Sequence, residues 1–290
     1  MVASVNDIPS LKCESCCATK QLSTGNAGNI ELAVISRTDV IKMDLDRITH
    51  PLRLAAGSHQ PESGKGCAMN AISYINGDTE VTDFPTCSAR PLAAFVQWCN
   101  DLLAGPDGYL SPEDSVLVLD LGWQTVGTAQ VSQTVIHAWV AELLANPTWG
   151  VVNYVESDAA QAIRDIAQLH RKVASGRAAP IAAWIAADRA AHGAATSMDT
   201  ALNAAGLYAV RAAYESMAPV DTDHGMILDA VTGNALRAHA LAAGGTASTR
   251  AIELARHAIS SWRYLAGLDT LDDIDHASVE NVLQRIWVLA

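Results

Sequence analysis

Apolar residues recur every three or four positions through most of this sequence, which is the spacing of one face of an α-helix. The signal is clearest from Ser157 to the C-terminus, where alanine-rich segments alternate with short breaks of glycine, proline or asparagine. Alanine has the highest helix propensity, and its small side chain lets neighbouring helices approach closely. The pattern therefore predicts a mostly α fold, an alanine-rich helical bundle.

The charge balance narrows the classes of partner. Half of the 290 residues are hydrophobic and 17% are charged, so we expect a sizeable core rather than disorder. The net charge is −12. Non-specific nucleic-acid binding and attachment to an anionic membrane surface both need a basic protein surface, so neither is expected. A protein partner with a basic surface is expected instead, because opposite charges steer association.

Three features of the sequence predict a cytoplasmic protein. The start of the chain, Met1 to Leu11, has no basic residues followed by an apolar run, as a secretory signal would have. No stretch reaches the ~18 consecutive apolar residues of a membrane-spanning helix. Six cysteines without an export signal are expected to be thiols or metal ligands rather than disulfides.

The chain is expected to have two parts. Residues 1–50 read as an irregular N-terminal segment, with a β-hairpin expected between Ile30 and Leu45. Residues 51–290 read as the α-helical domain. A subdivision of this domain near residues 146–157 is an alternative, because Asn146-Pro147 stops a helix there.

Local residues predict where several helices begin and which faces they bury. Ser111 before a proline is an expected N-cap, and this cap favours a helix over a buried strand for Val116–Leu121. A capping-box-like start is expected at Thr196–Asp199. Pro91 is expected to open a helix whose buried stripe includes Leu102.

One segment combines the features of a reactive thiol. The glycines of Gly64–Gly66 precede Cys67 at an expected helix start, where the helix dipole favours the thiolate. Glycines there let backbone N–H groups converge, as an oxyanion site requires. His59 is a candidate base, and Asp83 or Asn70 a candidate to orient it. The alternative is that Cys67 is a small buried hydrophobic residue and His59 a loop histidine.

A second cysteine pattern points to a metal. Cys13 and Cys16 are spaced as half of a zinc site. A structural zinc needs four ligands, and the sequence has no second Cys-x-x-Cys pair. Cys87, Cys67 or His59 would have to complete the shell from a distance. The alternative is a reduced N-terminal segment that binds no metal.

The remaining histidines and the tryptophans form no motif. His137 and His170 are among seven histidines scattered along expected helices, without the spacing of a metal site on one helix. Four tryptophans lie at helical spacing among aliphatic residues, which predicts core packing rather than a cofactor or base-stacking role. They are Trp98, Trp139, Trp184 and Trp262.

A set of short motifs lies between residues 55 and 128. They are Gly57-Ser58-His59, Gly66-Cys67-Ala68-Met69, Asp83-Phe84-Pro85-Thr86-Cys87, Pro91-Leu92-Ala93-Ala94-Phe95, Asn100-Asp101 and Val126-Gly127-Thr128. This Gly-Cys-x-Met helix start and Asp-x-Pro-x-Cys turn resemble those of a family of uncharacterised actinobacterial and actinophage proteins. The resemblance implies a host range and no activity. Phe84 stands where that family has histidine, and Asn70 where it has glutamate, which weakens a catalytic interpretation.

The sequence favours an interaction protein over an enzyme. Its acidity, its helical design and its incomplete catalytic motifs are typical of an acidic helical binder, such as an immunity-type protein or a phage-encoded modulator of a partner protein. A thiol-dependent enzyme for acyl transfer or amide hydrolysis, using Cys67 and His59, is the first alternative. A zinc-stabilised structural protein, using Cys13, Cys16 and either Cys87 or Cys67, is the second.

Overall fold

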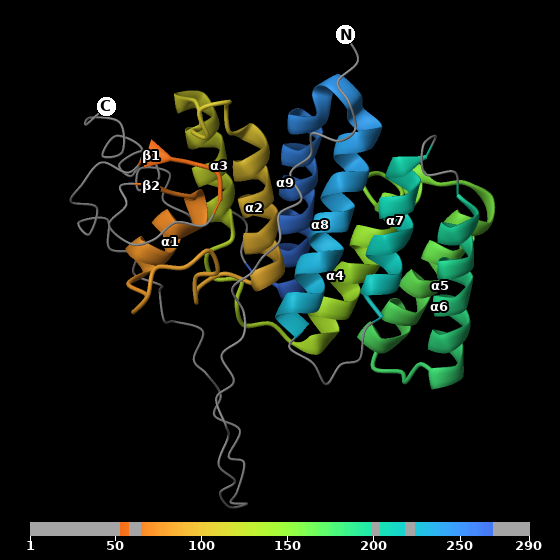
Figure 1. Ribbon diagram of the computed structural model, residues 1–290. Helices are drawn as coiled ribbons and strands as arrows, with labels where there is room; N and C mark the ends of the chain where they lie inside the picture. Colours follow the sequence, from red (N-terminus) through yellow and green to blue (C-terminus); the bar gives the residue numbers. More distant parts are fainter. Residues whose placement is uncertain (1–52, 58–64, 199–202, 218–223, 269–290) are drawn as a thin grey trace, which may run out of the picture. The chain divides into compact units, whose positions relative to one another are not determined.

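The computed structural model describes residues 53–57, 65–198, 203–217 and 224–268, and these residues are mostly helical (Figure 1). The mostly α prediction is confirmed. Two strands of two residues each, β1 (Arg53–Leu54) and β2 (Lys65–Gly66), pair in parallel. The α-helices are α1 (Ala68–Asn76), α2 (Arg90–Leu103), α3 (Pro112–Gln124), α4 (Gln133–Ala145), α5 (Ser157–Ala174), α6 (Ile181–Ser197), α7 (Ala204–Glu215), α8 (His224–Ala243) and α9 (Ala247–Ala266).

The expected segment 1–50 and its hairpin lie outside the described residues. The proposed domain boundaries therefore stay predictions. At 146–157, Asn146 ends α4 and a short 3-10 helix, η3 (Val151–Tyr154), follows. This helix packs against α4, α5, α7 and α8, so its side chains join the core rather than a solvated linker.

The helices pack in a continuous series. α1, α2 and α3 contact one another, and α2 also contacts α8 and α9. α4 packs against α9 on one side and α5 on the other, α6 packs against α5 and α7, and α7 packs against α8. Figure 1 shows this succession from α1 to α6. One connected set of buried side chains runs through it.

Three aromatic rings join the central helices. Phe95 of α2 meets the edge of Trp139 of α4 with 6.1 Å between ring centroids, and Trp139 meets Trp262 of α9 at 5.1 Å. The Trp139 indole N–H donates to the carbonyl of Ala258 at 2.8 Å, and the Trp262 indole N–H donates to the carbonyl of Thr128 at 3.2 Å. Buried indoles need such acceptors, because an unsatisfied N–H in the core is costly.

Local capping explains the helix starts that the sequence predicted. The Ser111 hydroxyl oxygen accepts from the backbone N–H of Asp114 at 3.1 Å, and its O–H donates to the Asp114 carboxylate at 2.7 Å. Val116–Leu121 lies within α3, so the helix preferred for this segment is confirmed. Gly77 ends α1 with φ of 81°, a left-handed conformation that favours glycine.

The helix start expected at Thr196–Asp199 is wrong. Thr196 and Ser197 instead end α6, since their hydroxyl groups donate back to the carbonyls of His192 and Ala194 at 2.7 and 2.9 Å. The next helix, α7, begins at Ala204 after an Asn203 cap whose side-chain oxygen accepts from the N–H of Gly206 at 2.9 Å. Serine and threonine bond in either direction, so hydroxyl residues alone do not fix which helix they belong to.

The burial expected for Leu102 is also wrong. Its side chain is 42% exposed, whereas Cys99 and the polar Asn100 are completely buried. Asn100 takes a core position because it has backbone partners there, and this sets the rotation of the last turn of α2. Leu102 consequently faces solvent.

α6 buries few residues and exposes two large apolar side chains. Ala187 and Ala191 are its buried residues, while Ile181 and Ile185 are 77% and 49% exposed. Even so, none of the helices within the described ranges is long and apolar enough to cross a membrane.

Asn100 connects the strand segment to the helices. Its side-chain N–H donates to the carbonyl of Ala55 at 2.8 Å, and its side-chain oxygen accepts from the N–H of Ala68 at 3.2 Å. The neighbouring Asp101 carboxylate accepts from the N–H of Gly57 at 2.8 Å. The chain around β1 and the first turn of α1 are thus held by α2.

Replacing Asn100 by leucine is expected to destabilise the fold. The substitution keeps the volume but removes the acceptor of the buried Ala68 N–H and the amide that donates to the Ala55 carbonyl, which costs roughly 1–3 kcal/mol. Urea unfolding monitored by circular dichroism measures the change. Asn153→Leu is the matched control, because Asn153 is exposed. Equal losses for the two variants would contradict the assigned role of Asn100.

Candidate functional site

The predicted thiol lies in a hydrogen-bond network centred on Asp83. Cys67 precedes the first turn of α1, and its thiol donates to the Asp83 carboxylate at 3.4 Å. The Asn70 amide donates to the same carboxylate oxygen at 2.8 Å, and its own side-chain oxygen accepts from the N–H of Cys67 at 3.0 Å. Gln97 of α2 donates to the other Asp83 oxygen at 3.0 Å. The structure therefore brings Cys67, Asn70 and Asp83 together, whereas the sequence had proposed Asp83 or Asn70 as a partner of His59.

The electrostatics of Cys67 oppose a thiolate. Burial raises the pKa of the Cys67 thiol far above its ordinary value, and the negative charge of Asp83 raises it further. Backbone N–H groups at the start of α1 act in the opposite direction and are outweighed. The side chain is completely buried. The helix dipole was the reason to expect a thiolate, but desolvation dominates when no solvent reaches the sulfur.

The loop that carries Asp83 is held by a second carboxylate. Asp78 follows α1 and accepts hydrogen bonds from Ser73 at 2.7 Å, from Asn76 at 2.7 Å and from Thr86. Partial burial acts to raise the pKa of Asp78, but these hydrogen bonds outweigh it and lower that pKa below its ordinary value. The loop between α1 and α2 is consequently tied at both ends.

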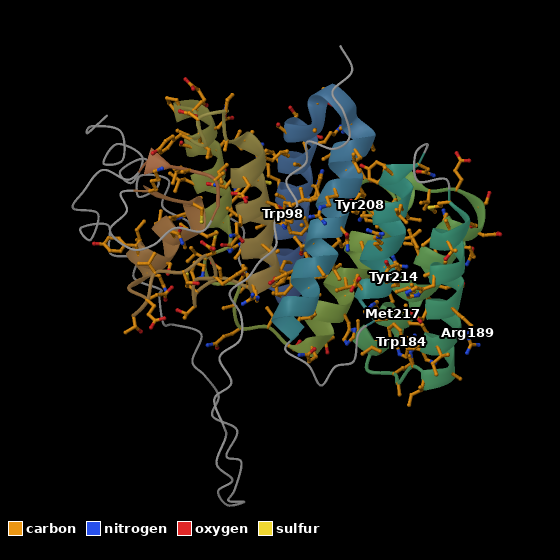
Figure 2. The ribbon with its side chains drawn as sticks, in the orientation of Figure 1. Trp98, Trp184, Arg189, Tyr208, Tyr214 and Met217 are labelled. Atoms are coloured by element: carbon orange, nitrogen blue, oxygen red, sulfur yellow. The ribbon has the colours of Figure 1, made fainter. Side chains whose placement is uncertain are left out.

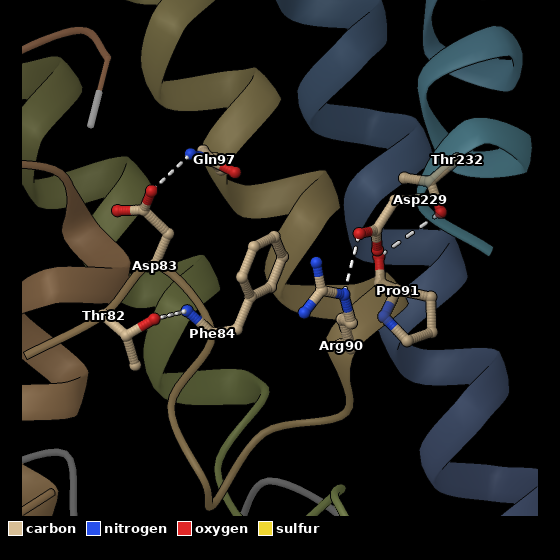
Figure 3. Close-up of polar contacts among 8 residues, drawn as sticks. All are labelled: Thr82, Asp83, Phe84, Arg90, Pro91, Gln97, Asp229 and Thr232. Carbon is tan, nitrogen blue, oxygen red and sulfur yellow. Dashed lines mark hydrogen bonds and ion pairs between the residues drawn. The ribbon is translucent and has the colours of Figure 1, made fainter. Parts of the chain in front are cut away.

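Beyond Asp83 the loop turns toward α8 (Figure 3). Phe84 lies under the Arg90 guanidinium, with 3.8 Å from its central carbon to the ring centroid. The same guanidinium forms an ion pair with Asp229 of α8 at 2.8 Å. Thr232 donates to the carbonyl of Pro91 at 3.4 Å. These contacts connect the loop and the start of α2 to α8.

The other predicted site residues do not join this network. His59, Cys13 and Cys16 lie outside the described residues. Cys87 is buried next to Ser88, with 3.8 Å between sulfur and hydroxyl oxygen. Within the described ranges, no group of three or more His, Cys, Asp or Glu side chains is arranged to hold a metal ion.

The described part of this network holds the Asp83 loop in place and does not activate the Cys67 thiol. A protonated, inaccessible thiol cannot attack a substrate, because the thiolate is the nucleophile. The thiol, the amides of Asn70 and Gln97, and the Asp83 carboxylate satisfy one another's hydrogen bonds. Their combined effect is to fix the loop against α1 and α2.

A histidine pair is the site that sequence reasoning missed. His137 of α4 and His170 of α5 face each other with 2.8 Å between their Nδ1 atoms, although 33 residues separate them. His170 Nε2 lies 3.0 Å from the Ser216 hydroxyl oxygen at the end of α7, and its ring meets the edge of Trp184 of α6. The signal available was one histidine on each of two consecutive helices, which is too common to interpret alone.

The geometry fixes the protons of this pair. The Ser216 hydroxyl donates to the carbonyl of Ala213 at 2.6 Å, so its oxygen accepts from His170 Nε2–H. His170 Nδ1 then carries no proton and accepts from His137 Nδ1–H. Burial and, to a smaller extent, the charge of His137 together lower the pKa of His170 to about 3. Neutral His170 donates to Ser216 rather than taking its proton, so Ser216 is not an activated nucleophile.

No protein-family model, curated protein or solved structure matches this chain. Its function therefore has to be argued from its own residues.

Cys67 is expected to resist alkylation in the native protein. Its raised pKa and its burial predict no reaction with iodoacetamide between pH 7 and 9, and full reaction once the chain is unfolded in guanidinium chloride. Peptide mass spectrometry reads the modification of each cysteine separately. Native-state reaction with an apparent pKa below the free-thiol value of about 8.5 would contradict this and support the thiol enzyme.

Acid is expected to destabilise the fold through His170. The unfolded chain takes up the proton near pH 6.5 and the folded chain only near pH 3, so stability is complete above pH 6.5 and falls as the pH decreases. Between pH 7 and 5 the loss from His170 is about 2 kcal/mol. Urea unfolding at both pH values should show a smaller loss for His170→Gln than for the wild type. The exposed His192→Gln should behave like the wild type, and equal losses in all three proteins would exclude the effect.

Proposed function

We propose that this chain is an acidic helical interaction protein that binds a partner protein with a basic surface. The observation that carries the proposal is a shallow depression of about 310 Å³ at the connection between α2 and α3. Two carboxylates, Asp107 and Asp114, line it together with apolar groups. The complete lining is Leu103, Gly105, Asp107, Tyr109, Leu110, Ser111, Pro112 and Asp114.

The connection is rigid enough to present a defined surface. Gly105 N–H donates to the carbonyl of Tyr109 at 2.8 Å, and Gly108 N–H donates to the carbonyl of Gly105 at 2.9 Å. Leu110 N–H donates to the carbonyl of Leu54 at 3.0 Å, which joins the connection to β1. A preformed surface binds at a smaller entropic cost than one that orders on binding.

Apolar side chains adjoin the depression and would add buried area. Leu102, one residue before the lining residue Leu103, is 42% exposed. Val116, one helical turn after Pro112, is 37% exposed, and Glu113 between them adds a third carboxylate. Interfaces commonly combine an apolar centre with a charged rim.

A cation already lies beside the depression. The Lys65 ammonium is 4.9 Å from the centroid of the Tyr109 ring. An aromatic face attracts cations through its quadrupole, and nearby carboxylates strengthen that attraction. A lysine or arginine of the partner would find the same chemistry. Occupying a basic surface of a partner is also how an immunity-type protein or a phage-encoded modulator would act.

The two alternatives have less support from the described residues. A thiol enzyme needs an accessible thiolate, and Cys67 is buried with a raised pKa. A zinc protein would depend on Cys13 and Cys16, which lie outside the described residues. Cys67 and Cys87 have different hydrogen-bond partners, Asp83 and Ser88.

Binding to basic peptides is the test. We expect a library of short peptides that combine arginine or lysine with leucine to contain binders whose affinity falls as salt rises. The double variant Asp107→Asn/Asp114→Asn should weaken binding about tenfold at low salt. The control is Asp165→Asn/Glu253→Gln, which removes the same charge from α5 and α9. Equal weakening by both double variants would show that net charge, and not this depression, attracts the peptides.

A further inference from the structure

Two arginines and two aromatic rings form a row across three helices. The Arg237 guanidinium of α8 lies between two rings, 4.8 Å from the centroid of Trp98 of α2 and 5.6 Å from that of Tyr208 of α7. Arg211, one turn beyond Tyr208 on α7, lies 5.5 Å from the same Tyr208 centroid. Figure 2 shows Trp98 and Tyr208 on the two sides of α8. We call these four residues the arginine–aromatic row.

The row is built into the packing of the helices. A Cβ atom at Gly233 would lie 3.2 Å from Trp98 Nε1, so the indole rests close against α8 one turn before Arg237. A larger residue at position 233 would displace Trp98. Rings on both sides restrict the Arg237 side chain, so little further freedom is lost when its N–H groups meet a ligand.

No carboxylate of the described residues forms an ion pair with the two arginines of the row. Within the described ranges, the guanidinium groups of Arg211 and Arg237 form neither an ion pair nor a side-chain hydrogen bond. Arg90 provides the comparison, since it also lies over a ring, that of Phe84, but is paired with Asp229 at 2.8 Å. The chain has 31 acidic residues against 19 basic ones. Two half-buried arginines that pair with no carboxylate of the described residues are therefore unusual in this protein.

We propose that the arginine–aromatic row binds a phosphate monoester. Two guanidinium groups near one ring supply two positive charges, and a phosphate monoester carries about −1.5 to −2 at pH 7. The planar N–H fork of arginine matches two oxygens of such a group. The net charge of −12 repels a long polyanion, so the ligand is a single phosphate ester and not a nucleic-acid strand.

The ester has two sources with the same recognition chemistry. One is a phosphorylated small molecule, and the other is a phosphorylated serine or threonine on a partner protein. The row shares no residue with the depression between α2 and α3, so failure of either proposal leaves the other untouched.

Isothermal titration calorimetry at low salt tests the proposal on the full chain. The probes are free O-phosphoserine, a five-residue peptide containing phosphoserine, and the same peptide with glutamate in its place. We expect one or both phosphate probes to bind and the glutamate peptide to bind at least about tenfold more weakly, because a carboxylate carries less charge. Binding of O-phosphoserine identifies the small-molecule source, and binding of the phosphopeptide alone identifies a phosphoprotein.

Three variants separate the row from general electrostatics. Arg237→Gln and Arg211→Gln should each weaken phosphate binding about tenfold or more, since each removes charge-assisted hydrogen bonds. Arg189→Gln removes one positive charge from the exposed side of α6, apart from the row (Figure 2), and should leave the affinity unchanged within about twofold.

Arg211→Gln keeps the test valid if Arg237→Gln unfolds the protein, because Arg211 contacts a single ring of the row. A thermal melt by circular dichroism establishes that each variant is folded. Three results would overturn the proposal: no binding of either phosphate probe to the wild type, equal binding of the glutamate peptide, or equal weakening by the Arg189 variant.

Discussion

The fold depends on how an alanine-rich core is filled. Alanine buries little area per residue, so the centre of the bundle relies on the contact of Phe95, Trp139 and Trp262 between α2, α4 and α9. Each indole also donates to a carbonyl on another segment, which fixes the rotation of its helix. Alanines let the outer helices α5, α6 and α7 pack closely, and the contact of His170 with Trp184 joins α5 to α6.

Polar groups inside the protein serve mainly to fix segments in place. Asn100, Asp83 and His170 each connect two or three elements through partnered hydrogen bonds. A buried polar group that is fully satisfied specifies one arrangement, because any other leaves a donor or acceptor without a partner. Residues that suggest catalysis in the sequence, above all Cys67 and Asp83, therefore serve to hold the loop against α1 and α2.

Acidic and basic side chains are placed in separate regions of the surface. Two carboxylates line the depression at the connection between α2 and α3, while Arg237 of α8 lies near the rings of Trp98 and Tyr208 and Arg211 of α7 lies near Tyr208 alone. The net charge gives no indication of this separation, because it averages over the whole chain. An acidic protein can therefore offer one region to a cationic partner and another to a single anionic group.

The sequence by itself determined the helical class, the N-cap at Ser111 and the end of α1 at Gly77, because periodicity and capping act within a few residues. It also proposed Cys67, Asn70 and Asp83 for one site, as partners of His59, because they lie within or near one short helix; the structure shows the three in one hydrogen-bond network. Tertiary structure alone decided that the Cys67 thiol is protonated, because desolvation depends on what covers the sulfur. It alone brought His137 to His170 and Trp98 to Arg237, since no local pattern encodes which distant helices meet.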